Sequence, residues 1–243
     1  MVQYKLRLAL PDGGQIPFFW AYRLYAWLLE QLPDEAAQLL HEHENRLISQ
    51  YLSRNTWVVN LFGETAALLE AALETTMQID LHGDRFLVLE RESHRIEGPE
   101  WFLQRGREIR AQKAELSFVS PASFKQAGRY AIFPQERLIL QSLLMRWNEA
   151  CPMYPLRDDD LLAEMENGLH LVDYSLRTGR FRLKSTAIPC FYGKVILEAR
   201  LPVVLQELWQ ALLCFAPYSG IGIKTTLGMG GVEVLFPERA KRL

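Results

Sequence analysis

Hydrophobic positions in the first half of the chain switch between the two-residue period of strands and the wider spacing of helices. Residues 2–10 alternate apolar and polar side chains, which predicts a strand with one buried face, and Pro11-Asp12-Gly13-Gly14 ends it. The aromatic and leucine spacing over 17–31 predicts a largely buried helix. The predicted order continues with a helix beginning at Pro33-Asp34, a strand at 56–62, a helix at 64–77 and a strand at 86–90.

The second half repeats this order in outline. Its pattern predicts a strand at 116–119, a helix at 134–150, a strand at 194–199, a helix beginning at Pro202 and a strand at 232–236. Residues 169–176 and 180–188 are predicted to pair as a hairpin around Thr178-Gly179. Two βαββαβ-like halves predict an α+β fold of two tandem ferredoxin-like domains, residues 1–115 and 116–243. Because no low-complexity linker separates the halves, we expect them to pack together.

Composition places the chain among soluble globular proteins. It has 243 residues, of which 49% are hydrophobic and 23% charged, so disordered, collagen-like and disulfide-scaffold classes are excluded. Its apolar runs are too short for a membrane span, and we expect neither a signal peptide nor a membrane partner. The three cysteines, Cys151, Cys190 and Cys214, form no CxxC pair, which argues against a zinc site and fits a reducing, cytoplasmic location.

The net charge of −2 is unfavourable for a nucleic-acid binder, but the charge is unevenly distributed. Residues 1–115 hold 12 Lys+Arg and 17 Asp+Glu, whereas residues 116–243 hold 15 and 12. Basic residues concentrate between 176 and 200, where they are Arg177, Arg180, Arg182, Lys184, Lys194 and Arg200. A concentrated stripe of this kind can bind a polyanion whatever the total charge is, and the alternative is a solvated face.

A glycine-rich segment from Ser219 to Gly231 lies between the last predicted helix and the last predicted strand. It holds two GxG units, which allow close backbone approach to a ligand and can present N–H groups and Lys224 to phosphate. Ile223 stands where a Walker A loop needs glycine, and a dinucleotide fingerprint would follow a strand instead of a helix. Taken alone, the glycines are better explained by tight turns than by a ligand.

The spacing of this loop, GxGxxxxxGxGG after an apolar helix, resembles the signature of the CRISPR-associated endoribonucleases of the RAMP superfamily, which cut precursor CRISPR RNA. Residues 180–184 (RFRLK) resemble the family's basic RNA-facing strand, and residues 120–125 (SPASFK) resemble the opening of its second domain. The resemblance implies two ferredoxin-like domains around an RNA-binding cleft, with RNA cut without metal or cofactor.

The same resemblance implies the catalytic residues. Leu40-His41-Glu42 matches a string in which the family often carries a catalytic histidine, and a protonated His41 would donate a proton to the leaving 5′-oxygen. Arg46 lies about where the family often has a lysine that stabilises charge on phosphorus. Tyr22 and Tyr25 lie near the position of the family's first-helix tyrosine and Tyr25 is the candidate, although the best register places Leu29 at that position.

Two further assignments complete the candidate site. His43 is assigned to packing, and a register slip would exchange it with His41; Asn45 excludes a HExxH zinc site. The other histidines, His82, His94 and His170, are assigned to the surface or to turns. The candidate RNA-binding residues are Arg177, Arg180, Arg182, Lys184, Gly220, Gly222, Lys224, Gly228 and Gly230.

The leading hypothesis is therefore a metal-independent endoribonuclease for CRISPR repeat RNA that leaves 2′,3′-cyclic phosphate and 5′-hydroxyl ends. The alternatives are a non-catalytic RNA-binding subunit of a CRISPR effector complex and an interaction module whose basic strand is merely solvated. Other subunits of an effector complex and a second copy of the chain are the further partners left open.

Overall fold

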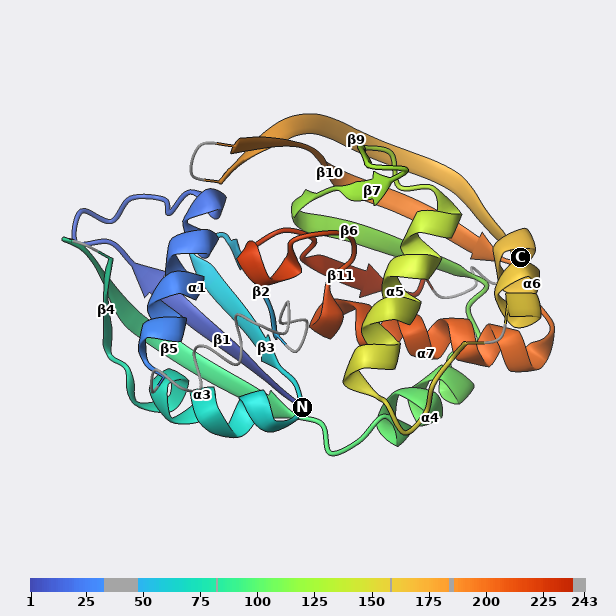
Figure 1. Cartoon of the computed structure of the whole chain (residues 1–243), viewed down its shortest axis with the longest axis horizontal. Coiled ribbons are helices and arrows are strands. Elements are labelled where there is room, and N and C mark those ends of the chain that lie inside the picture. The colour runs from blue at the N-terminus through green and yellow to red at the C-terminus, as the bar shows by residue number, and fades with distance from the viewer. Residues whose placement is uncertain (33–47, 82, 158, 184–185, 238–243) are drawn as a thin grey trace, which may run out of the picture.

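The computed structural model describes residues 1–32, 48–81, 83–157, 159–183 and 186–237. Two antiparallel sheets lie side by side, the first built from the N-terminal half and the second from the C-terminal half (Figure 1). The segment between the last helix and the last strand lies between them, next to strands of both sheets (Figure 1). None of the described helices is both long and apolar enough to cross a membrane.

The first half forms a five-stranded sheet in the order β2-β3-β1-β5-β4. Its elements are β1 (Val2–Ala9), η1 (Phe18–Trp20), α1 (Ala21–Glu30), β2 (Ile48–Ser53), β3 (Thr56–Leu61), α3 (Glu64–Thr75), β4 (Gln78–Leu81) and β5 (Asp84–Arg95). The predictions of β1, α1, β3, α3 and β5 are confirmed, although β5 is longer than expected. The helix predicted from Pro33-Asp34 lies outside the described residues.

Strand β2 was not predicted, because its polar residues are buried. Ser49 and Gln50 are 2% and 1% exposed, so the strand has no simple apolar–polar alternation to reveal it. Their side chains are satisfied by hydrogen bonds to distant parts of the chain. Strand β4 was not predicted, because its four residues are too few to show an apolar–polar alternation.

The second half forms a four-stranded sheet in the order β11-β6-β10-β9. Its elements are α4 (Glu100–Glu108), β6 (Lys113–Ala122), β7 (Phe124–Gln126), β8 (Arg129–Ala131), α5 (Glu136–Ala150), α6 (Asp159–Gly168), β9 (Leu169–Leu183), β10 (Thr186–Ala199), α7 (Val203–Ser219), η2 (Thr225–Leu227) and β11 (Val232–Leu235). The predicted strands at 116–119, 194–199 and 232–236 and the predicted helices at 134–150 and from Pro202 all correspond to observed elements.

The predicted turn at Thr178-Gly179 is wrong. Strand β9 runs straight through this pair, with Thr178 opposite Phe191 and Gly179 opposite Cys190 on β10. The two strands are joined only between Leu183 and Thr186, so the hairpin is longer than predicted. A tight two-residue turn would need left-handed backbone conformations, and Gly179 instead keeps its place in the ladder.

Each half buries its own hydrophobic cluster, and α4 belongs with the second although it precedes residue 116. Phe102 of α4 is fully buried beside Trp147 and Phe215 of the second half. Helix α4 crosses α7 closely at Gly106, where an added Cβ would lie 2.3 Å from the carbonyl oxygen of Glu207. The domain boundary near residue 115 stays a prediction.

The close crossing of α4 and α7 predicts a stability defect for Gly106→Ala. In a solvent-exposed helix this change would stabilise the protein by up to about 1 kcal/mol through helix propensity. Here the new methyl would overlap the backbone of α7, so we expect a net loss of about 1–3 kcal/mol in the free energy of unfolding, measured in urea. Gly179→Ala is the control, because its Cβ would make only ordinary contacts of 3.4 Å or more; equal effects would contradict the steric explanation.

Candidate functional site

The glycine-rich segment packs directly against the first half of the protein. An added Cβ at Gly228 would lie 2.4 Å from the Cβ of Ala21 at the start of α1. One at Gly231 would lie 2.4–2.8 Å from ring atoms of Tyr51 on β2. The absence of side chains at these positions is therefore what allows the loop to approach α1 and β2. We call this contact the seam: residues 219–231 against α1 and β2.

The glycines also shape the loop itself. Gly220, Gly222, Gly228 and Gly230 all have positive φ, between 69° and 103°, which favours glycine over other residues. Backbone N–H donors within the loop are used inside the protein: Gly220 donates to Ala216, Ile221 to Gly230, Gly222 to Ser142 Oγ, Ile223 to Ser123, Gly230 to Pro121 and Gly231 to Ser120 Oγ. Packing and turn geometry thus suffice to explain these glycines, and their contact with RNA stays a prediction.

Lys224 is the exposed residue at the turn of this loop. It has left-handed backbone angles, φ 57° and ψ 33°, and immediately precedes the short helix η2. Its carbonyl oxygen accepts hydrogen bonds from the N–H groups of Leu227 and Met229, which closes the turn. The loop therefore holds the backbone of Lys224 firmly while its side chain remains in solvent.

A second set of buried polar side chains joins the first sheet to the end of α7. Gln3 Nε2 donates to Asn60 Oδ1 at 2.8 Å, and Asn60 Nδ2 donates to Ser49 Oγ at 3.0 Å. Ser49 Oγ in turn donates to the carbonyl oxygen of Tyr218 at 2.5 Å. These residues lie opposite one another across β1, β3 and β2, on the face that points away from the first hydrophobic cluster.

The basic residues of the long hairpin are exposed but do not all share a face. Phe181 stacks on Phe18 of η1, with ring centroids 6.0 Å apart, so the hairpin contacts the first half. Because side chains alternate along a strand, Arg180 and Arg182 point away from the side of Phe181, whereas Arg177 shares it. No carboxylate of the described residues forms an ion pair with these three arginines. Lys184 lies outside the described residues.

Of the predicted catalytic residues, only Tyr25 is described. His41, His43 and Arg46 lie outside the described residues, and β2 is the strand that follows them in the sequence. Tyr25 is 9% exposed and packs in the first hydrophobic cluster, and this burial raises the pKa of its hydroxyl. The structure therefore gives Tyr25 a packing role, and its part in catalysis stays a prediction.

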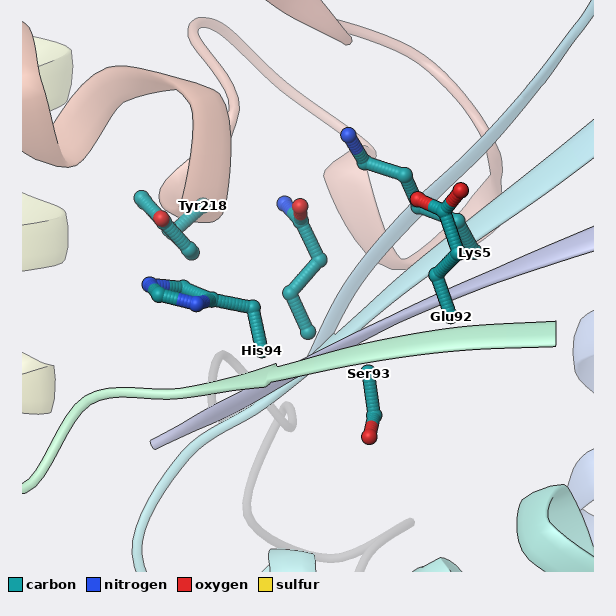
Figure 2. Close-up of a pocket in the computed structure, with 6 residues that line it drawn as sticks. Lys5, Glu92, Ser93, His94 and Tyr218 are labelled. Carbon is teal, nitrogen blue, oxygen red and sulfur yellow. The ribbon is translucent and has the colours of Figure 1, made fainter.

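A pocket of about 190 Å³ was not anticipated from the sequence. Figure 2 shows its lining side chains on β1 and β5, with Tyr218 of α7 opposite His94. The His94 ring lies 6.4 Å from the Tyr218 ring and 6.2 Å from the Trp101 ring. His94 and His170 are exposed as predicted, and His82 lies outside the described residues. The pocket could not be predicted from the sequence, because it depends on the cross-strand register that places Gln3 opposite His94.

The described residues offer neither a metal centre nor an activated thiol. No group of three or more His, Cys, Asp or Glu residues among them could hold a metal ion. Burial raises the pKa of the Cys151 and Cys214 thiols to about 11, and it also raises that of Cys190. These thiols are therefore protonated at neutral pH and are poor nucleophiles.

Comparison with known proteins yields one family. Residues 116–232 match the family model of the CRISPR-associated endoribonuclease Cas6. A curated Cas6 endoribonuclease from Streptococcus thermophilus is 29% identical over 222 residues, covering 88% of this chain and 90% of that protein.

Solved structures show the same fold. A Cas6 product complex superposes with a TM-score of 0.77 at 23% identity, covering 97% of this chain and all of that one. A Thermus thermophilus Cas6 superposes with a TM-score of 0.74 at 24% identity, covering 96% and 98%. The predicted α+β fold of two tandem ferredoxin-like domains is confirmed.

The close approach at the seam predicts that Gly231→Ala destabilises the protein. The added methyl overlaps the ring of Tyr51, and we expect a loss of about 1–3 kcal/mol in urea unfolding. The same change in a Tyr51→Ala background should cost much less, because the overlapping ring is gone. An equal cost in both backgrounds would show that Tyr51 is not the obstacle.

Proposed function

The chain belongs to the Cas6 family of CRISPR-associated endoribonucleases, and from this premise we propose that it cleaves CRISPR repeat RNA in a precursor transcript to release guide RNAs. The observation that carries the proposal is the seam. The glycine loop and the basic hairpin lie within the span that matches the family model. That loop packs on β2, the strand that directly follows His41 and Arg46 in the sequence.

The proposed reaction needs no group beyond the RNA and the protein. The ribose 2′-oxygen attacks the adjacent phosphorus, the bond from phosphorus to the 5′-oxygen breaks, and the 2′-hydroxyl loses its proton to a base. His41 gives a proton to the leaving 5′-oxygen, and Arg46 stabilises the negative charge that develops on phosphorus. The products are a 2′,3′-cyclic phosphate and a 5′-hydroxyl end. Tyr25 is the remaining candidate in this group.

RNA binding is assigned to the second half. Arg180 and Arg182 are exposed on one side of the hairpin, and Lys224 is exposed on the loop, so all three can reach phosphate groups. Arg177 lies on the same strand, and Lys184, which is outside the described residues, remains a candidate RNA contact. A chain with a net charge of −2 can bind RNA in this way because its basic residues are concentrated in the second half. The acidic first half limits the number of phosphates that can be bound.

Cleavage of repeat RNA in EDTA by the purified protein tests the proposal. Wild-type protein should produce ends with a 2′,3′-cyclic phosphate, and His41→Ala should lower the rate by about 10²–10⁴-fold because the leaving oxygen loses its proton donor. His43→Ala is the matched control and should retain the wild-type rate within a few-fold. If His43→Ala is the inactive variant, the two histidines exchange roles.

A different outcome would favour the alternative function. Tight binding of repeat RNA without cleavage products would indicate an RNA-binding subunit of a CRISPR effector complex. Weak binding that does not change with salt would instead indicate a protein-interaction module.

The hairpin arginines predict a change in the salt dependence of binding. Replacing both Arg180 and Arg182 by Ala should weaken binding of repeat RNA and reduce the slope of log K against log salt by about 0.7 per lost phosphate contact. Arg7→Ala is the control, because Arg7 is paired with Glu90 on the first sheet. An unchanged slope in the double variant would show that these arginines do not contact phosphate.

A further inference from the structure

Gln50 is a buried amide on the core-facing side of β2. It is 1% exposed, and its neighbours Ile48 and Leu52 on the same face belong to the first hydrophobic cluster. Burying an amide among apolar side chains is costly unless its polar atoms find partners. An apolar residue would meet the packing pattern of this face, so the amide requires an explanation of its own.

Three hydrogen bonds supply that explanation, and each leads to a different element. Gln50 Nε2 donates to the carbonyl oxygen of Ala21 in α1 at 3.0 Å and to that of Thr226 in η2 at 2.9 Å. Gln50 Oε1 accepts a hydrogen bond from Trp57 Nε1 in β3 at 2.8 Å. The Trp57 bond fixes the orientation of the amide, so that its N–H groups point at the Ala21 carbonyl in α1 and, across the seam, at the Thr226 carbonyl.

The loop contact places Gln50 against the turn that carries Lys224. Thr226 lies two residues beyond Lys224 within the closed turn formed by the hydrogen bonds to the Lys224 carbonyl. At Gly228, an added Cβ would lie 3.6 Å from Gln50 Nε2, so a second residue of this turn also lies close to the amide. Moving Thr226 would therefore move Lys224.

We propose that Gln50 is a positioning residue of the RNA cleavage site, and the inference rests on the proposed function. It acts through the loop: it holds η2, and with it Lys224, at a fixed place relative to α1 and β2. Gln50 contacts no RNA and takes no part in proton transfer. Its loss leaves RNA binding by the hairpin intact but displaces Lys224, which the proposed function assigns to a phosphate of the bound RNA.

Gln3 provides a matched control. It is also a buried glutamine of the first sheet, 8% exposed, and it donates a hydrogen bond to Asn60. Its contact leads through Ser49 to the end of α7 and not to η2. Gln3→Leu and Gln50→Leu therefore both remove a buried amide from the same sheet, but only the second releases the loop.

The test measures single-turnover cleavage of repeat RNA at saturating protein, the Kd for the same RNA and urea unfolding. Both variants should unfold at lower urea than wild type. Gln50→Leu should lower the cleavage rate by about 10–100-fold, because small displacements in an active site cost that much, with Kd changed less than about threefold. Gln3→Leu should keep the wild-type rate within about threefold.

A double-mutant cycle tests whether Gln50 acts through Lys224. Lys224→Met should itself slow cleavage, and adding Gln50→Leu to it should cost little more, because the displaced cation is already absent. Multiplying effects would overturn the proposal, as would a wild-type rate in Gln50→Leu. If wild-type protein does not cleave repeat RNA, the proposed function fails and the inference with it. Should Gln50→Leu not fold, Trp57→Phe removes the bond that orients the amide and should show the same pattern, more weakly.

Discussion

The arrangement of the two halves depends on how closely a loop can approach a strand. Gly228 and Gly231 bring the backbone of the loop against Ala21 and the Tyr51 ring, at distances that no side chain at those positions would permit. Hydrogen bonds from Gln50 and Ser49 then use this proximity to join the first sheet to η2 and to α7. These short contacts therefore help to set the relative position of the halves, together with the stacking of Phe181 on Phe18.

Local regularity explains what was predictable in the fold. The alternation of β1 and the apolar spacing of α1 and α7 are each contained within a short stretch, and each of these elements was predicted correctly. Strand β2 was not predictable, because Ser49 and Gln50 are buried by partners about 170 positions away. The turn at Thr178-Gly179 was predicted wrongly because local turn propensity was outweighed by ladder pairing along the whole length of β9.

The candidate site follows the same division. The loop, Lys224 and the basic strand could be proposed as site candidates from the sequence, because glycine spacing and charge are visible along the chain. The prediction interpreted the glycines through a ligand, whereas the structure explains them through packing and internal hydrogen bonds. The alternating faces of the hairpin, the burial of Tyr25 and the pocket beside His94 depend on register and three-dimensional packing, which no linear pattern contains.

The long separation of the seam contacts in sequence has a consequence for synthesis of the chain. Thr226 emerges from the ribosome 176 residues after Gln50, which at typical elongation rates corresponds to roughly ten to forty seconds. During this interval the nascent first half presents Ser49, Gln50 and Asn60 without the loop and helix that later contact them. Water can hydrogen-bond to these groups in the interim, whereas an apolar surface of the same extent would promote association between nascent chains. Polar residues at this junction can therefore be solvated by water until residues 219–231 are synthesised.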